Sequence, residues 1–237
     1  MTRAVPSPRV VSLVPSVTES LLAWGLEPVA VTRFCEHPEL RSVGGTKDPD
    51  IASIVAMQPD LVVVNTEENR RQDAEDLAAA GVEVLVLDID TVDDVAPALD
   101  ALAQACGLDA VAPSLEPAVD PPARVRAFVP IWRRPWMALG PRCYGTSLLA
   151  RLGVDVVQPE GAADQRYPTV ELDAVAAASP DVVLAPSEPY PFAERHVAEL
   201  AVVAPVHLVD GKDLFWWGWR TPSAIDRLGH LVDRWAA

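Results

Sequence analysis

The spacing of apolar and polar residues alternates along the chain between strand-like and helix-like, and this alternation predicts strands and helices in turn. Short apolar runs of strand length lie at 9–14, 28–32, 61–65 and 82–87, and stretches with helical spacing lie at 16–24, before Pro59, and at 70–80. Alternating strands and helices favour parallel pairing with right-handed crossovers. The first part of the chain is therefore predicted to be an α/β unit.

One segment of this pattern occurs twice. Residues 54–65 predict the end of a helix, a Pro-Asp turn and a buried strand, and residues 175–185 repeat the same order. The two Pro-Asp pairs, Pro59-Asp60 and Pro180-Asp181, are 180 − 59 = 121 positions apart. Upstream, 13–15 matches 139–141, and downstream 84–88 matches 206–210. Because the matching segments occur in the same order and are separated by nearly the same number of residues, they predict two structurally similar lobes.

The connection between the lobes is predicted from a change in composition. Residues 91–106 keep helical spacing, Gly107 ends that helix, and the prolines at 113–122 disfavour a continuous helix. We expect an N-terminal α/β lobe at 1–88, a connecting helix and proline-rich linker at 89–124, and a C-terminal α/β lobe at 125–237. In the second lobe we expect strands at 126–131, 137–139, 155–157, 181–185 and 206–209 and helices after 145, before Pro180, at 193–200 and at 223–235.

The loops after the strands are the expected ligand site, because open α/β sheets bind ligands at the carboxyl ends of their strands. The first of these loops precedes a helix whose start at Ser16, with Glu19 three residues on, has the spacing of a capping box.

Charge and cysteine content exclude several classes of protein. The 237-residue chain has a net charge of −15, which disfavours nucleic acid and anionic membranes as partners. Its three cysteines have no framework spacing, and no apolar run is long enough for a membrane-spanning helix. The N-terminus has no signal-peptide pattern, so we expect a cytoplasmic protein as the sequence is written, and an extracytoplasmic one if the start is trimmed or misassigned.

Candidate catalytic groups are few. The chain has no dinucleotide fingerprint, P-loop or nucleophile elbow. Cys35 and His37 form a Cys-x-His pair, although two ligands do not make a metal site. Glu67 and Glu68 are adjacent carboxylates that could act as general acid and base. Adjacent loop carboxylates usually form a solvated face, so we expect no enzyme and no required cofactor.

Aromatic residues give the stronger indication of function. Five of the seven tryptophans, together with Phe34, Tyr144 and Tyr190, fall in predicted loops. Ligand pockets are lined with aromatic side chains and a few polar groups. This composition favours a large, flat or apolar ligand.

Four segments together resemble one family: 9–19, 54–64, the strand after Gly81, and the ending from Asp210-Gly211 to Arg220-Thr221-Pro222. The family is the helical-backbone (class III) substrate-binding proteins of metal-chelate ABC importers, and the resemblance is greatest to its cobalamin-binding members. It implies two α/β lobes joined by a long helix, with the ligand in a cleft between the lobes.

The resemblance also implies a set of site residues. By similarity the ligand contacts are Pro15, Ser16, Phe34, Cys35, Glu36, His37, Glu67, Glu68, Trp132, Tyr144, Glu188, Tyr190, Trp216, Trp217, Trp219 and Arg220. His37 is the candidate axial ligand to a bound metal. Family members dock on a permease through one glutamate per lobe, and Asp50 and Asp173 are the nearest carboxylates here.

The leading hypothesis is a non-enzymatic binding protein for a cobalamin-like corrinoid or related metal chelate, with an ABC permease as a candidate partner. One alternative is a cytoplasmic enzyme or sensor of corrinoid or chelate metabolism that uses Glu67, Glu68 or Cys35. A ferric-siderophore or haem binding protein, and a protein-interaction module with a tryptophan-rich face, are the others.

Overall fold

A computed structural model describes residues 7–109, 112–113, 115, 120–158 and 165–235, and its chain divides into two compact units. The first unit takes the described residues of 1–89 and 93–114 together with Trp217–Arg220. The second takes those of 90–92, 115–216 and 221–237. The predicted three-part division at 1–88, 89–124 and 125–237, and the ligand cleft between the lobes, stay predictions.

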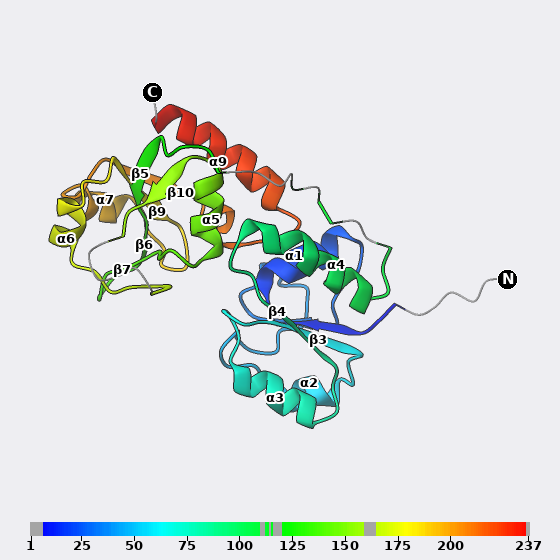
Figure 1. The fold of residues 1–237 in the computed structure, drawn as a ribbon. Helices are drawn as coiled ribbons and strands as arrows, with labels where there is room; N and C mark the ends of the chain where they lie inside the picture. The colour runs from blue at the N-terminus through cyan, green and yellow to red at the C-terminus, as the bar shows by residue number, and fades with distance from the viewer. Residues whose placement is uncertain (1–6, 110–111, 114, 116–119, 159–164, 236–237) are drawn as a thin grey trace. The chain divides into compact units, whose positions relative to one another are not determined.

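The first unit is built on a four-stranded parallel sheet with the order β2-β1-β3-β4. Two helices, α1 and α4, lie on one side of the strands, and α2 and α3 lie on the other (Figure 1). The elements are β1 (Val10–Ser12), α1 (Pro15–Ala23), β2 (Ala30–Val31), α2 (Ile51–Ala56), β3 (Leu61–Asn65), α3 (Arg71–Ala79), β4 (Val84–Leu87), the 3₁₀ helix η1 (Val92–Asp94) and α4 (Val95–Ala105).

Strand pleating explains this two-sided packing, because successive side chains point to opposite faces of the sheet. Val11 and Val62 pack with Ile54 of α2 and Leu77 of α3 in one buried cluster. Continuously buried strands such as β3 are expected where helices cover both faces.

The second unit repeats the same architecture. Its four-stranded parallel sheet has the order β10-β9-β5-β8, so β5, β8, β9 and β10 take the places of β1, β2, β3 and β4. The prediction of two similar α/β lobes with parallel sheets is confirmed. The elements are β5 (Val125–Phe128), β6 (Pro130–Trp132), β7 (Met137–Ala138), α5 (Tyr144–Arg151), β8 (Val154–Val156), α6 (Leu172–Ala177), β9 (Val182–Pro186), α7 (Glu194–Leu200), β10 (Val206–Val209), α8 (Gly211–Phe215) and α9 (Thr221–Trp235).

The Pro-Asp repeat has the same local structure in both units. In the first unit, the carboxylate of Asp60 accepts the backbone N–H of Arg9 at 2.7 Å, and the Arg9 side chain donates to the carbonyl of Met57 at the end of α2. Gln58, just before Pro59, has a φ of 49°. This arrangement joins the end of the helix to the start of the central strand.

The second unit repeats each of these contacts. Asp181 accepts the backbone N–H of Arg126 at 2.7 Å, and the Arg126 side chain donates to the carbonyls of Ala178 and Ser179. Ser179, just before Pro180, has a φ of 53°. The prediction that the two Pro-Asp pairs play the same part is confirmed.

Two local predictions, the capping box and the loop after β10, are wrong, and the strand expected at 137–139 is present as β7 but lies outside the main sheet. The helix α1 begins at Pro15 with Val14 as its N-cap and no side-chain cap, so Ser16 and Glu19 do not form a capping box. The reason is that proline is pre-organised for the first helical position. The strand at 137–139 lies in an antiparallel hairpin with β6, outside the four-stranded sheet. The loop expected after β10 contains α8, which begins with Asp210 accepting the N–H of Lys212.

The connecting segment has a shorter helix than the resemblance implies. The helix α4 has 11 residues and ends at Ala105, and Gly107 follows with a φ of 62°. The described residues 107–109, 112–113, 115 and 120–124 are not helical. The rest of the proline-rich stretch lies outside the described residues.

Candidate functional site

Several candidate site residues of the first unit follow the carboxyl ends of its parallel strands. In the first unit, Pro15 and Ser16 follow β1, residues 34–37 follow β2, and Glu67 and Glu68 follow β3. Because the carboxyl ends of parallel strands meet at one edge of a sheet, these three loops belong to the same edge.

Two asparagines fix the loop after β3. The side-chain carbonyl of Asn65 accepts the backbone N–H groups of Glu67 at 2.8 Å and Glu68 at 3.2 Å. Asn69 is buried, and its amide donates to the carbonyls of Leu13 and Thr46, both at 3.0 Å. The loops after β1 and β3 are therefore held together by side-chain hydrogen bonds.

Glu67 and Glu68 are half-buried at this edge. Lys47 donates from its ammonium group to the backbone carbonyl of Glu67 at 2.6 Å, which places a positive charge beside the pair. This arrangement holds the loop backbone in place and brings both glutamates to the predicted ligand-binding edge.

The loop after β2 presents one exposed ring and one buried thiol. Phe34 is 52% exposed, and the guanidinium of Arg33 lies 5.0 Å from the centre of its ring. The Sγ of Cys35 is buried beside the Oγ1 of Thr18 at 3.2 Å. Phe34 is therefore the exposed aromatic side chain of this loop, while Cys35 anchors the loop.

His37 does not lie in a metal-binding cluster. Its Nδ1 is 2.9 Å from a carboxylate oxygen of Glu39, and Glu36 beside it is exposed. Within the described part of the chain, no group of three or more His, Cys, Asp or Glu side chains is arranged to hold a metal ion. An axial contact from His37 to the metal of a bound chelate stays a prediction.

Residues 217–220 pack on α1 in the first unit. The N–H of Trp219 donates to the Oγ of Ser20 at 3.1 Å, and Arg220 forms two hydrogen bonds with the carboxylate of Glu19 at 2.8 and 3.2 Å. Trp217 is buried, whereas Trp219 is 45% exposed. Of the predicted tryptophans here, Trp219 offers its ring and Trp217 holds the segment in place.

In the second unit, Trp132 and Tyr190 come together. Their ring centres are 5.6 Å apart in an edge-on contact, and Trp132 is 44% exposed. Tyr190 rests on Phe192 and His196, with ring centres 4.8 and 5.4 Å away. The hairpin β6–β7 and the loop after β9 therefore present an aromatic surface that rests on the core.

The other predicted residues of the second unit are more enclosed. Tyr144 is buried, and its hydroxyl lies 3.0 Å from the Oγ1 of Thr221. Glu188 packs closely against Gly211, where an added Cβ would lie 2.4 Å from its Cγ. Trp216 ends α8 with the Lys212 ammonium 5.1 Å from its ring centre. Of these three, Glu188 and Trp216 keep part of their side chains exposed.

The two candidate docking carboxylates lie at equivalent helix starts. Asp50 is the N-cap of α2, where it accepts the N–H of Ser53 at 3.0 Å and its hydroxyl at 2.6 Å. These hydrogen bonds lower the pKa of Asp50. Asp173 is exposed in the first turn of α6. A docking role for either stays a prediction.

Sequence reasoning missed the residues that hold the site in place. The buried polar side chains of Asn65, Asn69 and His196 hold the site in place through hydrogen bonds to distant or irregular backbone. The only signal for Asn69 was its position after a strand end. His196 stood alone in the sequence, with nothing to indicate that Tyr190 and Phe192 would surround it.

Comparisons with known proteins agree with this fold. The chain matches the family described as periplasmic binding protein over residues 10–198. The vitamin B12-binding protein of Salmonella choleraesuis (strain SC-B67) is 32% identical over 101 residues, which cover 41% of this chain and 38% of that protein. The match thus spans well under half of the relative's length.

Two solved structures show the same fold over nearly the whole chain. The periplasmic vitamin B12 binding protein BtuF of Vibrio cholerae has a TM-score of 0.76 at 20% identity and covers 97% of this chain and 98% of its own. The apo form of the periplasmic heme-binding protein RhuT from Roseiflexus sp. RS-1 has a TM-score of 0.76 at 20% identity, covering 98% and 100%.

These findings define the class of protein. Two α/β units with parallel sheets of matching order, and a family match over most of the chain, place it among two-lobed binding proteins. The chain belongs to the periplasmic binding protein family.

Proposed function

We propose that this protein is a non-enzymatic, extracytoplasmic binding protein for a flat metal chelate, with a cobalamin-like corrinoid as the leading ligand. Family membership supports a binding role. The relative and the two solved structures described above are named for binding vitamin B12 or heme, and none of the three is named as an enzyme. The enzyme alternative through Glu67, Glu68 or Cys35 is not carried forward.

The observation that carries this proposal is the placement of exposed rings. Six large hydrophobic side chains of the described chain are exposed, and three of them are aromatic: Phe34, Trp132 and Trp219. Aromatic rings supply a large apolar contact area, and ligand pockets are lined predominantly with such side chains. All three belong to the set implied by the family resemblance: Phe34 and Trp219 belong to the first unit and Trp132 to the second.

A flat chelate suits these rings better than a small polar solute. Aromatic faces provide contact area at little loss of side-chain freedom, and the fixed loop after β3 supplies a few polar groups for orientation. A corrinoid is preferred because the relatives at 32% identity or more are named vitamin B12-binding proteins. Heme or a ferric siderophore is the alternative, favoured by heme-binding structures of the same fold.

The relatives named periplasmic favour an extracytoplasmic location over the cytoplasmic one first expected. No helix in the described part of the chain is both long and apolar enough to cross a membrane. We propose an ABC permease as the partner. Asp173 is its candidate contact, since the carboxylate of Asp50 is already engaged with Ser53.

Equilibrium dialysis against cyanocobalamin, aquocobalamin, hemin and a ferric hydroxamate would test the proposal. We expect saturable binding of one chelate at micromolar concentration or below, a free energy of about −8 kcal/mol or better. Phe34→Ala and Trp132→Ala should each weaken that binding about tenfold. Val202→Ala, at an exposed aliphatic residue away from the strand ends, is the matched control and should change nothing. Failure of all four chelates to bind would refute the proposal.

A further inference from the structure

The edge strand β10 has a free side. Among the described strands it is the outermost of its sheet, and its one partner there is β9. Leu208 in the middle of this strand is 41% exposed. An exposed apolar edge strand is a template for pairing with another chain, and natural proteins usually block it with lysine, proline or a bulge. The strand β10, Val-His-Leu-Val, has none of these.

The alternation of hydrogen bonds along the strand shows which backbone groups of β10 face away from β9. The carbonyl of Pro205 accepts the N–H of Val183 in β9, and the carbonyl of Val209 accepts the N–H of Ser187 just after β9, so residues 205, 207 and 209 bond inward. Val206 and Leu208 therefore direct their N–H and C=O groups away from β9. In the described part of the chain no hydrogen bond to these outward groups is found.

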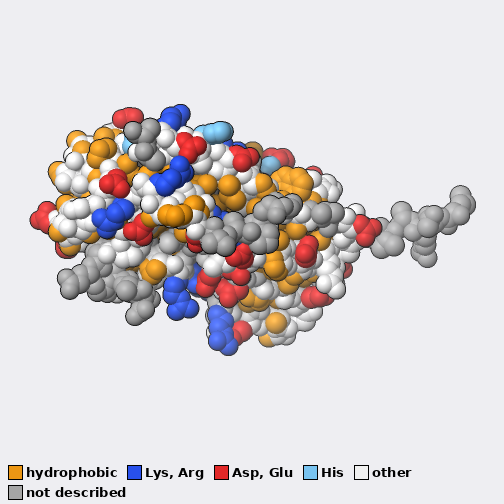
Figure 2. Space-filling view, turned by 45° about the horizontal axis from the view of Figure 1, so that its top comes forward, with side chains coloured by type: hydrophobic (Ala, Val, Ile, Leu, Met, Phe, Trp, Pro, Cys, Tyr) orange, Lys and Arg blue, Asp and Glu red, His pale blue; other side chains and the backbone are white. Residues whose placement is uncertain are grey.

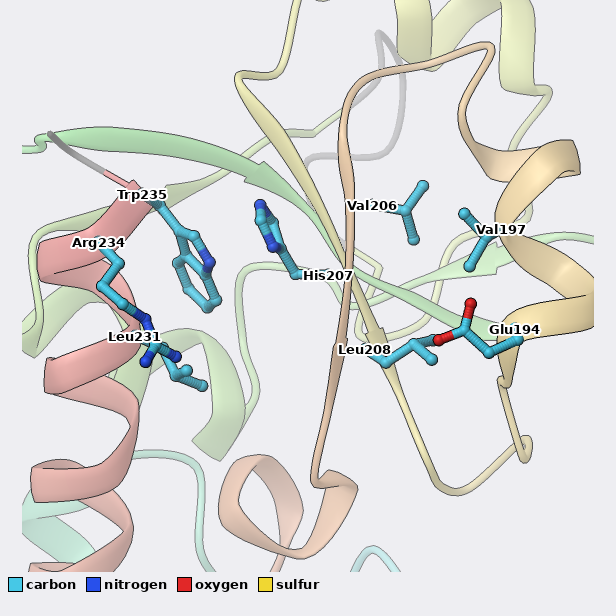
Figure 3. Close-up of a pocket in the computed structure, with 8 residues that line it drawn as sticks. All are labelled: Glu194, Val197, Val206, His207, Leu208, Leu231, Arg234 and Trp235. Carbon is cyan, nitrogen blue, oxygen red and sulfur yellow. The ribbon is translucent and has the colours of Figure 1, made fainter.

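Two helices form walls beside this edge (Figure 3). The helix α9 brings Leu231, Arg234 and Trp235 to one side, where the Trp235 ring centre lies 5.1 Å from that of His207. The helix α7 brings Glu194 and Val197 to the other side, next to Val206 and Leu208. The pocket has a volume of about 380 Å³ and opens along the strand.

The walls differ in charge. Arg234 on α9 and Glu194 on α7 make no ion pair with any side chain of the described ranges. Burial and the nearby Arg234 lower the pKa of His207, so at neutral pH the cationic group of the α9 wall is Arg234. A strand laid along β10 would direct alternate side chains to the two walls.

A second copy of the chain does not fit this charge pattern. If the β10 strands of two copies paired in antiparallel fashion, the copies would be related by a two-fold axis perpendicular to the sheet. The α9 walls of the two copies would then lie on one face of the joined sheet and the α7 walls on the other. Arg234 would then lie on the same side as the other Arg234, and Glu194 on the same side as the other Glu194. Like charges on a shared face disfavour that pairing.

We propose that the free edge of β10 binds an extended peptide segment of another protein, as an added strand. The segment has acidic or aromatic residues on the side facing α9 and basic or aliphatic residues on the side facing α7. Backbone hydrogen bonds to Val206 and Leu208 supply affinity, and the two walls supply specificity. This peptide site is separate from the strand-end residues that carry the proposed ligand function, and it does not depend on the chelate.

A random linear heptapeptide display library, selected on the immobilised full chain, provides the probe. The best peptide, labelled with fluorescein, is then titrated by fluorescence anisotropy. We expect enriched peptides that alternate acidic with basic or aliphatic residues, and a Kd on the order of 10 μM.

Leu208→Pro is the decisive variant, because it removes an N–H that β9 does not use, and proline is tolerated on edge strands. We expect it to weaken peptide binding at least tenfold. Val86→Pro is the matched control: Val86 holds the equivalent outward place on the edge strand β4 of the first unit and is 52% exposed. It should leave binding unchanged.

Arg234→Glu tests the α9 wall without changing the strand. It should weaken an acidic peptide at least tenfold, and a repeated selection on this variant should enrich basic residues at the same alternate positions. Undiminished binding to Leu208→Pro and Arg234→Glu would overturn the proposal. The proposal would also be overturned if the library enriched no peptide that binds the wild-type chain more tightly than these variants.

Discussion

Gly218 allows residues 217–220 to approach α1 more closely than a residue with a side chain could. It has a φ of 115°, and an added Cβ would lie 2.5 Å from the Oγ of Ser20. That hydroxyl also accepts the N–H of Trp219. One glycine and one serine thus place the exposed ring of Trp219 on α1.

Gly218→Ala should therefore destabilise the protein by about 3 kcal/mol, because the unfavourable φ adds to a clash with Ser20. Gly25→Ala is the matched control. Gly25 has a φ of 79° but nothing within 4 Å of an added Cβ, so it should cost about 1 kcal/mol. Urea unfolding measures both. Equal costs for the two variants would show that the contact with Ser20 does not matter.

Asn69→Ala removes the donors to the carbonyls of Leu13 and Thr46 and the acceptor of the Asn65 N–H. We expect a loss of about 2 kcal/mol of unfolding free energy, because carbonyls of Leu13 and Thr46 lose buried partners. Gln72→Ala, on the exposed surface of α3, should change stability by less than about 0.5 kcal/mol. Denaturant unfolding of both variants measures these changes in unfolding free energy. An Asn69→Ala variant as stable as the wild type would contradict a stabilising role for Asn69.

Sequence reasoning at the residue scale identified which side chains lie at the strand ends but not which of them are exposed. Phe34, Trp132 and Trp219 were predicted and present their rings. Trp217 and Tyr144 were predicted alike, yet they are buried. Exposure depends on packing between distant segments, such as Tyr144 with Thr221, and no local pattern encodes it.

At the scale of elements, α7 depends on the protonation of one histidine. The Nδ1 of His196 accepts the backbone N–H of Ala193 at the helix start, at 3.1 Å. Burial, and then the charges of Arg195 and Arg133, lower the pKa of His196. The neutral ring is therefore the form that the folded protein favours.

Since the folded-state pKa of His196 lies below its unfolded value, its contribution to stability is complete above about pH 6.5 and is lost as pH falls through the folded value. We expect the unfolding free energy to decline on acidification from pH 7.5 to pH 5. In His196→Asn, whose side-chain oxygen keeps an acceptor without titrating, the decline should be smaller. The same decline in wild type and variant, measured by urea titration at each pH, would exclude His196 as its source.

Element order was largely predictable because hydrophobic period and the Pro-Asp turn are local signals. The β3 and β9 strands and the helices before them follow directly from the repeated segment. The β6–β7 hairpin and α8 were missed. Met137 was predicted to begin a strand and does so, but its antiparallel pairing with Trp132 has an irregular register that spacing does not reveal.

At the scale of the whole molecule, acidic residues outnumber basic ones, with 34 Asp and Glu against 19 Lys and Arg. Figure 2 shows acidic and basic side chains interspersed with apolar ones on the face in view. The net charge is −15. A strongly acidic chain disfavours nucleic acid as a partner. The two-lobed α/β architecture was predictable from the internal repeat, whereas the identity of the ligand depends on three-dimensional contacts that the pattern does not encode.

The central claim is that this chain binds one flat metal chelate. Isothermal titration calorimetry of the purified protein with cyanocobalamin, and with hemin in parallel, tests it most directly. The account predicts one site per chain for one of the two, with a Kd of about 1 μM or below. Heat changes no larger than dilution for both chelates, or binding that remains unsaturated at millimolar concentration, would contradict it.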